Sequence, residues 1–210
     1  MKNDECSMYI AMMFKGNVFL LKKKVIIINF LFVLFFVLIP VFYSHGGEHV
    51  VLYRLGMKDP VAWDQLRRYL GTKGYKISMF DGSDNIEKHV ENVNKINRLK
   101  ASALIAMDFG VSDQNRTIVA VTIAKKGKGN ILAIEEVPAL FASESRELAT
   151  SLASVFNKGV KELPLFPLLG VDIPGVYMKI DFTPDKTTEV LEKLHQGMQG
   201  YFKRGTKDER

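Results

Sequence analysis

The sequence predicts an α/β domain in which a mostly parallel β-sheet is flanked by helices. Short runs typical of strands alternate along the chain with longer segments whose apolar residues recur every three or four positions. One run, ALIAM at residues 103–107, has no polar side chain, as expected of a strand buried on both faces of a parallel sheet. Glycines and prolines separate these runs, and no internal repeat is present.

The first half of the predicted domain contains two strands and two helices. Residues 50–53 form a short buried strand, and a helix opens at Pro60 with Asp59 as its N-cap. Gly71 and Gly74 mark the end of that helix, and residues 75–80 alternate as a second strand. The next helix begins at Ser83 and carries an apolar stripe: Ile86, Val90, Val93, Ile96 and Leu99.

The second half continues the alternation after the strand at 103–107. A β-rich run at residues 117–124 is followed by a solvated turn at 125–130 and a short strand at 131–134. A helix is expected at 143–158, and a proline-punctuated loop at 163–169. Residues 176–182 form the last strand, and Thr183 and Pro184 lead into a final helix that ends near Lys203.

The segment before the domain has a different character. Residues 25–43 carry no charge and are long enough to cross a bilayer as a helix. Lys22, Lys23 and Lys24 precede this run, which predicts that residues 1–24 stay in the cytoplasm and the rest is exported. A cleaved signal peptide is the alternative, with Ser44 and Gly46 at a poor cleavage site. Because the run exceeds the usual signal core of about 7–15 residues, an uncleaved transmembrane helix is the favoured interpretation.

Residues 49–204 form the predicted domain, with a linker at 44–48 and a polar tail at 205–210. About 160 residues are enough for one domain with its own core. The only cysteine, Cys6, lies before the apolar run, so the domain has no internal disulfide. The formal charge is +6, but no basic stripe interleaved with aromatic residues occurs, and nucleic acid is not an expected partner.

Three blocks of the chain resemble the zinc-dependent N-acetylmuramoyl-L-alanine amidases, in that family's order. The first is LRRYLGTKGYKI at 66–77 with the helix that follows it, and the second is ASALIAMDFG at 101–110. The third runs from 148 to 202 and contains PGVYMKIDF at 174–182, where the family has a pattern close to PAVLVEIGF. Together the blocks cover most of residues 60–203, so the resemblance implies an amidase-like fold.

The resemblance also implies where a catalytic site would lie. In the family, two histidines and a glutamate hold Zn²⁺, and a carboxylate on the last strand takes the proton of a zinc-bound water. The position of that carboxylate is occupied here by Lys179, and the position of the second histidine by Asp108. Residues 55–59 replace the loop that bears the first histidine and contain neither His nor Glu; Leu55 falls roughly at the glutamate ligand.

These departures predict a catalytically inactive, amidase-like cell-envelope protein without a cofactor. It would be anchored in the bacterial inner membrane with its domain in the periplasm or extracytoplasmic space. Asp108 and Lys179, at the rim of the former active site, would contact a peptidoglycan peptide or an envelope protein, or pair with each other. The alternative is an active zinc amidase with an atypical metal site formed by His45, His49 and Asp108. A third hypothesis is a structural domain with no ligand.

Other polar or aromatic residues are interpreted as structural. His45, Glu48 and His49 could gather one ion, but an extended linker places residues 45 and 49 about 13 Å apart at roughly 3.3 Å per residue. A polar spacer is therefore the preferred interpretation of this segment. His89 and His195 lie on predicted helices and are expected to be surface or hydrogen-bonded residues, whereas Trp63 and Tyr69 are expected to be packing groups.

Overall fold

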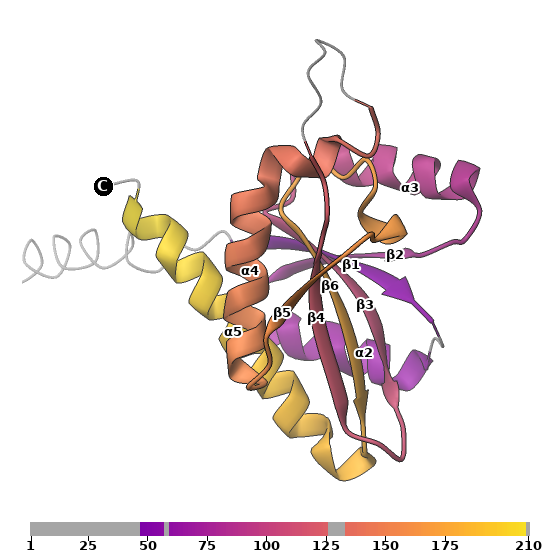
Figure 1. Cartoon of the computed structure of the whole chain (residues 1–210). Coiled ribbons are helices and arrows are strands. Elements are labelled where there is room, and N and C mark those ends of the chain that lie inside the picture. The colour runs from indigo at the N-terminus through magenta and orange to yellow at the C-terminus, as the bar shows by residue number, and fades with distance from the viewer. Residues whose placement is uncertain (1–46, 57–58, 126–132, 209–210) are drawn as a thin grey trace, which may run out of the picture. The chain divides into compact units, whose positions relative to one another are not determined.

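The computed structural model describes residues 47–56, 59–125 and 133–208, and residues 47–210 cluster as one compact unit (Figure 1). The predicted cytoplasmic arm, the predicted transmembrane helix at 25–43 and residues 44–46 of the linker lie outside the described residues. Within the described ranges, no helix combines the length and the apolar character needed to span a membrane. The membrane anchor therefore stays a prediction.

A single six-stranded sheet forms the centre of the domain, with the strand order β2-β1-β3-β6-β4-β5. Four of the neighbouring pairs are parallel, and the pairing of β4 with β6 is antiparallel, so the sheet is mixed and mostly parallel as predicted. The strands are β1 (His49–Leu55), β2 (Lys76–Asp81), β3 (Ala103–Val111), β4 (Arg116–Thr122), β5 (Val160–Leu163) and β6 (Gly175–Phe182).

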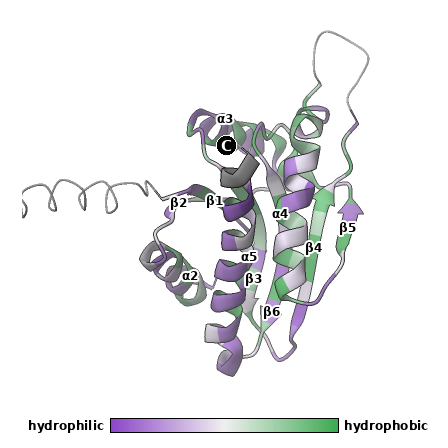
Figure 2. Cartoon of the chain, turned by 90° about the vertical axis from the view of Figure 1, so that its left-hand side faces the viewer, coloured by the Kyte–Doolittle hydropathy of each residue, from purple (hydrophilic) through white to green (hydrophobic). Residues whose placement is uncertain are grey.

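Helices cover the two faces of this sheet unequally (Figure 1). The faces are flanked by α2 (Pro60–Thr72), α3 (Ile86–Arg98), α4 (Ala142–Val155) and α5 (Thr187–Asp208). Side chains of α2, α4 and α5 pack on one face, whereas α3 packs on the other together with the short helix η2 (Phe166–Leu168). In Figure 2 much of α5 is hydrophilic, while β4 inside the sheet is largely hydrophobic, as expected of a strand between layers.

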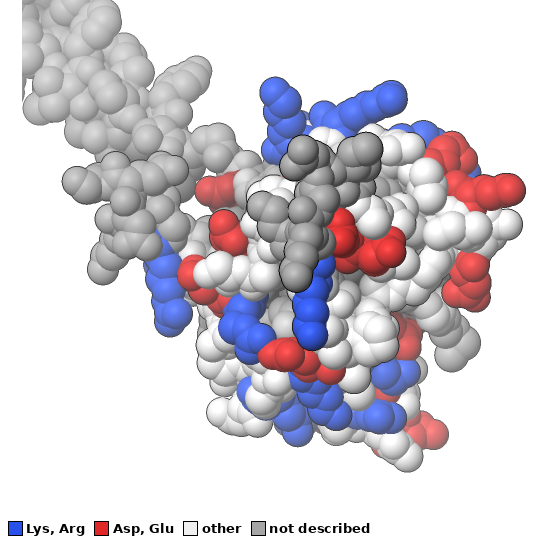
Figure 3. Space-filling view, turned by 45° about the horizontal axis from the view of Figure 1, so that its top comes forward, with Lys and Arg blue, Asp and Glu red and all other residues white. Residues whose placement is uncertain are grey.

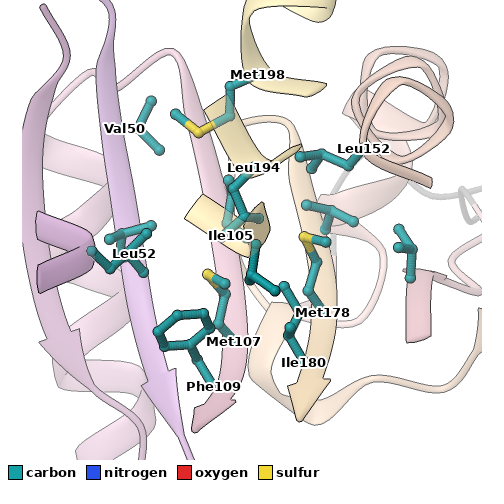
Figure 4. Close-up of a cluster of buried hydrophobic side chains, with 14 of the residues drawn as sticks. Val50, Leu52, Ile105, Met107, Phe109, Leu152, Met178, Ile180, Leu194 and Met198 are labelled. Carbon is teal, nitrogen blue, oxygen red and sulfur yellow. The ribbon is translucent and has the colours of Figure 1, made fainter. Parts of the chain in front are cut away.

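The larger core lies between the sheet and the three helices α2, α4 and α5. Alternate side chains of each strand point into it, because neighbouring residues of a strand face opposite sides of the sheet. Full burial of a large apolar side chain contributes roughly 1.5–3 kcal/mol relative to exposure. The side chains seen in Figure 4 include Val50, Leu52, Ile105, Met107, Phe109, Leu152, Met178, Ile180, Leu194 and Met198.

The start of α2 confirms the predicted cap, whereas α3 begins later than the predicted start at Ser83. Oδ1 of Asp59 accepts hydrogen bonds from the backbone N–H groups of Val61 and Ala62, at 2.9 and 3.3 Å. The cap of α3 is Asn85 rather than Ser83, because Oδ1 of Asn85 accepts from the N–H of Lys88 at 3.0 Å. Ser83, Asp84 and Asn85 are all residues of capping type, so the sequence alone does not decide where the helix begins.

The predicted apolar stripe of α3 is only partly correct. Val93 and Ile96 are buried, but Ile86 and Leu99 are 49% and 37% exposed. Two polar residues, His89 and Asn92, are buried on the helix instead. The helix therefore packs through a face that periodicity of apolar residues alone does not identify, because hydrogen bonding makes the burial of these polar groups acceptable.

Three predicted elements differ from the structure. The predicted strand at 131–134 lies outside the described residues at 131 and 132, and Ala133 and Ile134 belong to a loop and turn. The predicted helix at 143–158 ends at Val155, and the left-handed φ of 53° at Asn157 turns the chain. Strand β5 was not predicted, because Lys161 and Glu162 make this short edge strand polar.

His89 links α3 to β1 and to the loop after β5. Its Nε2 lies 3.1 Å from the carbonyl oxygen of Leu169, so this nitrogen donates and Nδ1 must accept from the hydroxyl of Tyr53, also at 3.1 Å. Asn92, the other buried polar residue of α3, donates from Nδ2 to the carbonyl oxygen of Asp81 at 2.8 Å. Burial lowers the pKa of the His89 imidazole, which favours the neutral form with one donating and one accepting nitrogen.

We expect the stability of the domain to fall as the pH is lowered below about 6.5, the ordinary pKa of histidine. Since the pKa of His89 is lowered in the folded state, the unfolded chain binds the proton more readily and is favoured by acid. Burial also lowers the pKa values of His49 and His195, which act in the same direction. The midpoint of thermal unfolding, measured from pH 7.5 to pH 5, checks this expectation.

The variant His89→Gln is the control for this pH dependence. Glutamine can accept from Tyr53 and donate to Leu169 without titrating. We expect a smaller acid-induced decrease of the unfolding temperature than in the unmodified chain. Equal decreases in both proteins would contradict a role for His89.

Candidate functional site

The two residues singled out by the sequence, Asp108 and Lys179, lie side by side at the centre of the sheet. Strands β3 and β6 are parallel neighbours, and their register pairs Asp108 with Lys179. Met107, Phe109, Met178 and Ile180 point into the large core (Figure 4), so Asp108 and Lys179 point to the opposite face. The sheet register therefore brings together two residues that are 71 positions apart in the sequence.

An ion pair joins these two side chains. Nζ of Lys179 donates to Oδ2 of Asp108 at 2.7 Å, and it lies 3.7 Å from Oδ1 of Asp181. The side chains of Lys179, Asp108 and Asp181 are 29%, 24% and 24% exposed, so the cluster borders solvent. The hydrogen bond that Lys179 donates to Asp108 is the main cause that raises the pKa of Lys179, and it outweighs the opposing effect of desolvation. Lys179 is thus a permanent cation at neutral pH.

Two neighbours of this cluster were not identified from the sequence. Tyr177 and Asp181 lie two residues before and after Lys179 on the same strand and so share its face. Burial raises the pKa of the Tyr177 hydroxyl, and the nearby charge of Asp108 raises it further. On β4, Arg116 pairs in register with Asp181. The alternation of side chains along β6 could have placed Tyr177 and Asp181 on the same face as Lys179. The position of Arg116 beside Asp181 could not be predicted, because it depends on the antiparallel register of β4 with β6.

The loop after β1 closes over Asp108 from the other side. Gly56 has a positive φ of 61°, and a Cβ atom built on it would lie 2.1 Å from Oδ1 of Asp108. Only glycine therefore fits this position without a shift of the carboxylate or the backbone. Asp108 is held between the backbone at Gly56 and the ammonium of Lys179.

The residues of this site do not fit a catalytic zinc ion. Such an ion takes three protein ligands, usually His, Glu, Asp or Cys, and keeps one position open. Over the described ranges, no three such residues are grouped closely enough to hold a metal. The nearest cation to the Asp108 carboxylate is the ammonium of Lys179, which would repel an incoming metal ion.

The structure also separates the residues of the alternative metal site. His45 lies outside the described residues. His49 begins β1 and its Nε2 is 2.9 Å from Oγ of Ser78, whereas Asp108 pairs in register with Leu55 at the other end of that strand. Six residues of strand correspond to about 20 Å at roughly 3.3 Å per residue. His49 and Asp108 therefore do not share one ion.

The other residues considered in the sequence analysis take part in packing or in hydrogen bonds within the fold. Trp63 is 1% exposed and meets Phe109 edge to face at 5.5 Å between ring centroids, which confirms its role in packing. His89 is fully buried and hydrogen-bonded. His195 and Tyr69 are half-buried and pack edge to face at 6.5 Å, away from the Asp108–Lys179 pair on the α5 side of the sheet.

The Asp108–Lys179 pair combines an ammonium and a carboxylate that both border solvent. The ammonium of Lys179 has no tendency to accept a proton, and the carboxylate of Asp108 already accepts a charge-assisted hydrogen bond. A ligand carboxylate could share Lys179, and a ligand amine or guanidinium could share Asp108 or Asp181. The geometry therefore suits a partner that carries charged groups.

No family model and no curated protein matches this chain. Among solved structures, it is similar to the catalytic domain of the CD27L endolysin that targets Clostridia difficile, with 10% identity over 73% of this chain and 97% of that chain and a TM-score of 0.49. It is also similar to the catalytic domain of CwlV, an N-acetylmuramoyl-L-alanine amidase from Bacillus (Paenibacillus) polymyxa var. colistinus. The identity is 11% over 74% of this chain and 98% of that chain, with a TM-score of 0.49.

A third similar structure is the apo form of the N-acetylmuramyl-L-alanine amidase Ami1 from Mycobacterium abscessus. The identity is 16% over 75% of this chain and 99% of that chain, with a TM-score of 0.47. The structural neighbours of this domain are thus catalytic domains of amidases and endolysins. Similarity at this level assigns no residue role and no activity to this chain.

We expect the Asp108–Lys179 pair to stabilise the fold modestly, because both side chains border solvent. A double-mutant cycle with Asp108→Ala and Lys179→Ala should give a coupling energy of about 0.5–1 kcal/mol in chemical denaturation. The matched control is the more exposed pair of Lys193 with Glu189 on α5, for which a smaller coupling is expected because solvent screens it more strongly. Additive effects of the two substitutions at Asp108 and Lys179 would contradict the ion pair.

Proposed function

We propose that this protein is a catalytically inactive, amidase-like protein of the bacterial cell envelope that recognises a charged partner at the Asp108–Lys179 pair. The proposal is supported by the three sequence blocks that resemble the zinc-dependent amidases. It depends above all on one observation, the 2.7 Å contact between Nζ of Lys179 and Oδ2 of Asp108. At the two positions where the resemblance implies a zinc ligand and a catalytic carboxylate, the chain instead has an internal ion pair.

The loss of reaction follows from electrostatics. Hydrolysis of an amide by a zinc-bound water needs a metal that lowers the pKa of the water and a carboxylate that removes its proton. A permanent ammonium at the carboxylate position supplies neither function and disfavours a cation nearby. The shortened loop at Gly56 also occupies space next to Asp108. These features act together, so no single substitution is expected to restore activity.

The anchoring part of the proposal rests on the N-terminal sequence. The uncharged run at residues 25–43, with Lys22, Lys23 and Lys24 before it, places the domain outside the cytoplasm if the run spans the inner membrane. The partner is then a molecule of that compartment, either a peptidoglycan peptide or an envelope protein. Peptidoglycan peptides carry carboxylates and amines, which are the groups that Lys179 and the two aspartates can bind.

Wall digestion tests the absence of the reaction. We expect the full-length chain to release no peptide from purified peptidoglycan, with or without added Zn²⁺, under conditions in which an active amidase does. Zinc analysis after dialysis should give far less than one ion per chain, because fewer than three ligands are available at the site. Stoichiometric zinc together with peptide release would instead establish an active amidase with an unusual metal site.

Binding to immobilised peptidoglycan fragments tests the role of Lys179. The substitution Lys179→Glu leaves three carboxylates together and should weaken binding about tenfold, which corresponds to about 1.4 kcal/mol. The control is Lys158→Glu, which makes the same change of charge at an exposed residue in the turn between α4 and β5. Equal binding by both variants and the unmodified chain would remove Lys179 from the recognition of this ligand.

A further inference from the structure

A cluster of aromatic and basic side chains lies at the end of the domain where the parallel strands β1 and β2 begin. Tyr75 packs against Phe202 and against the ring of His195, both at 5.9 Å between centroids, and His195 also meets Tyr69. Nζ of Lys73 lies 5.1 Å from the centroid of the Tyr69 ring. These aromatic rings are half-buried, and the exposed cations beside them are Lys73, Lys76, Lys203 and Arg204. We call this set the aromatic–basic end.

The described chain begins at this same end. The N–H of Lys76 donates to the carbonyl oxygen of Glu48 at 3.1 Å, and Gly47 lies directly against the backbone of Gly74. The carboxylate of Glu48 accepts a hydrogen bond from Oγ of Ser102 at 2.6 Å, and its charge acts on Tyr75, so one acid lies among the cations at this end. Lys73 and Lys76 therefore lie on the segment that contacts the point at which residue 47 enters the domain.

Chain length limits how far this end can lie from the apolar run. Residues 44–46 alone separate Tyr43, the last residue of the run, from Gly47. Four residue steps span at most about 14 Å, at 3.3–3.6 Å per residue. If residues 25–43 cross the bilayer, as in the proposed function, Gly47 and its neighbours must lie within that distance of the membrane surface.

We propose that the aromatic–basic end is a docking surface for the head groups of an anionic lipid bilayer. This inference rests on the membrane anchoring of the proposed function. Tyrosine rings and the long side chains of lysine and arginine suit the interface, because each combines an apolar part with a polar tip. Basic residues next to a membrane segment are attracted by the head groups of anionic lipids.

The attraction is local to this end of the domain. On the face shown in Figure 3, basic and acidic side chains are interspersed, and no large patch of positive or negative charge is seen. A bilayer held close by the anchor does not require such a field, because the short linker already supplies a high local concentration of lipid. The cations of the aromatic–basic end then determine which way the domain is turned.

Docking would orient the candidate site away from the membrane. The aromatic–basic end is at the start of the parallel strands, whereas Asp108 lies five residues along β3 from Ala103, about 16 Å farther along the sheet at roughly 3.3 Å per residue. The Asp108–Lys179 pair would then face the space beyond the head groups. A peptide or protein in that space could reach the pair without passing the bilayer.

Depth-dependent quenching in vesicles tests the docking surface with the full-length chain. The cysteine-free background Cys6→Ser receives a single labelled cysteine by Thr72→Cys, next to the aromatic–basic end, or by Asp113→Cys, beyond the opposite end of β3. The vesicles contain equal parts of phosphatidylcholine and phosphatidylglycerol, with brominated chains as quenchers. We expect quenching of the label at position 72 and none at position 113.

Charge reversal tests the role of the cations. Lys73→Glu, Lys76→Glu and Lys203→Glu combined should abolish quenching at position 72 while the chain still floats with the vesicles. The matched control reverses three lysines elsewhere, Lys158, Lys161 and Lys186, and should keep the quenching. Equal quenching in vesicles of phosphatidylcholine alone would overturn the recognition of anionic lipid.

Flotation separates the failure of this inference from the failure of the anchor. A chain that floats with vesicles but gives the same signal at positions 72 and 113 would overturn the docking surface and leave the anchor intact. A chain that does not float would overturn the anchor of the proposed function, and the docking surface with it. Flotation with quenching confined to position 72 would support both.

Discussion

The parallel pairing of β3 with β6 is the constraint on which the rest of this structure depends. Its register sets Met107 beside Met178 on one face of the sheet and Asp108 beside Lys179 on the other. The methionines join the large core, so a shift of one residue would bury the charged pair and expose the core side chains. The hydrophobic pattern therefore fixes the position of the ion pair, and the ion pair contributes little to choosing the fold.

The same central location explains why the character of the site differs from that implied by the sequence resemblance. Adjacent parallel strands bring a metal ligand and a catalytic base close together, and they bring a lysine and an aspartate equally close. In this chain the two charges are opposite and neutralise each other at 2.7 Å. The result is a charged, partly exposed pair at the centre of the sheet.

Most helices and strands could be predicted because their signals are local. Asp59 and Pro60 together define the start of α2, and the apolar run at residues 103–107 identifies the centre of β3. The features that were not predicted depend on contacts between residues that are distant in the sequence. Strand β5 is polar and exists through its pairing with β4, and α3 buries His89 because Tyr53 and Leu169 satisfy both ring nitrogens.

The sequence by itself determined the alternating α/β pattern, the identities of Asp108 and Lys179, and the absence of a cysteine from residues 47–210. It could not decide which side chains meet, because period-two alternation gives a face to each residue but not its neighbour on the next strand. The tertiary structure decided that Lys179 bonds Asp108, that Asp181 and Tyr177 flank it, and that Gly56 closes over the carboxylate. These contacts depend on strand register, which is set by the packing of the whole core.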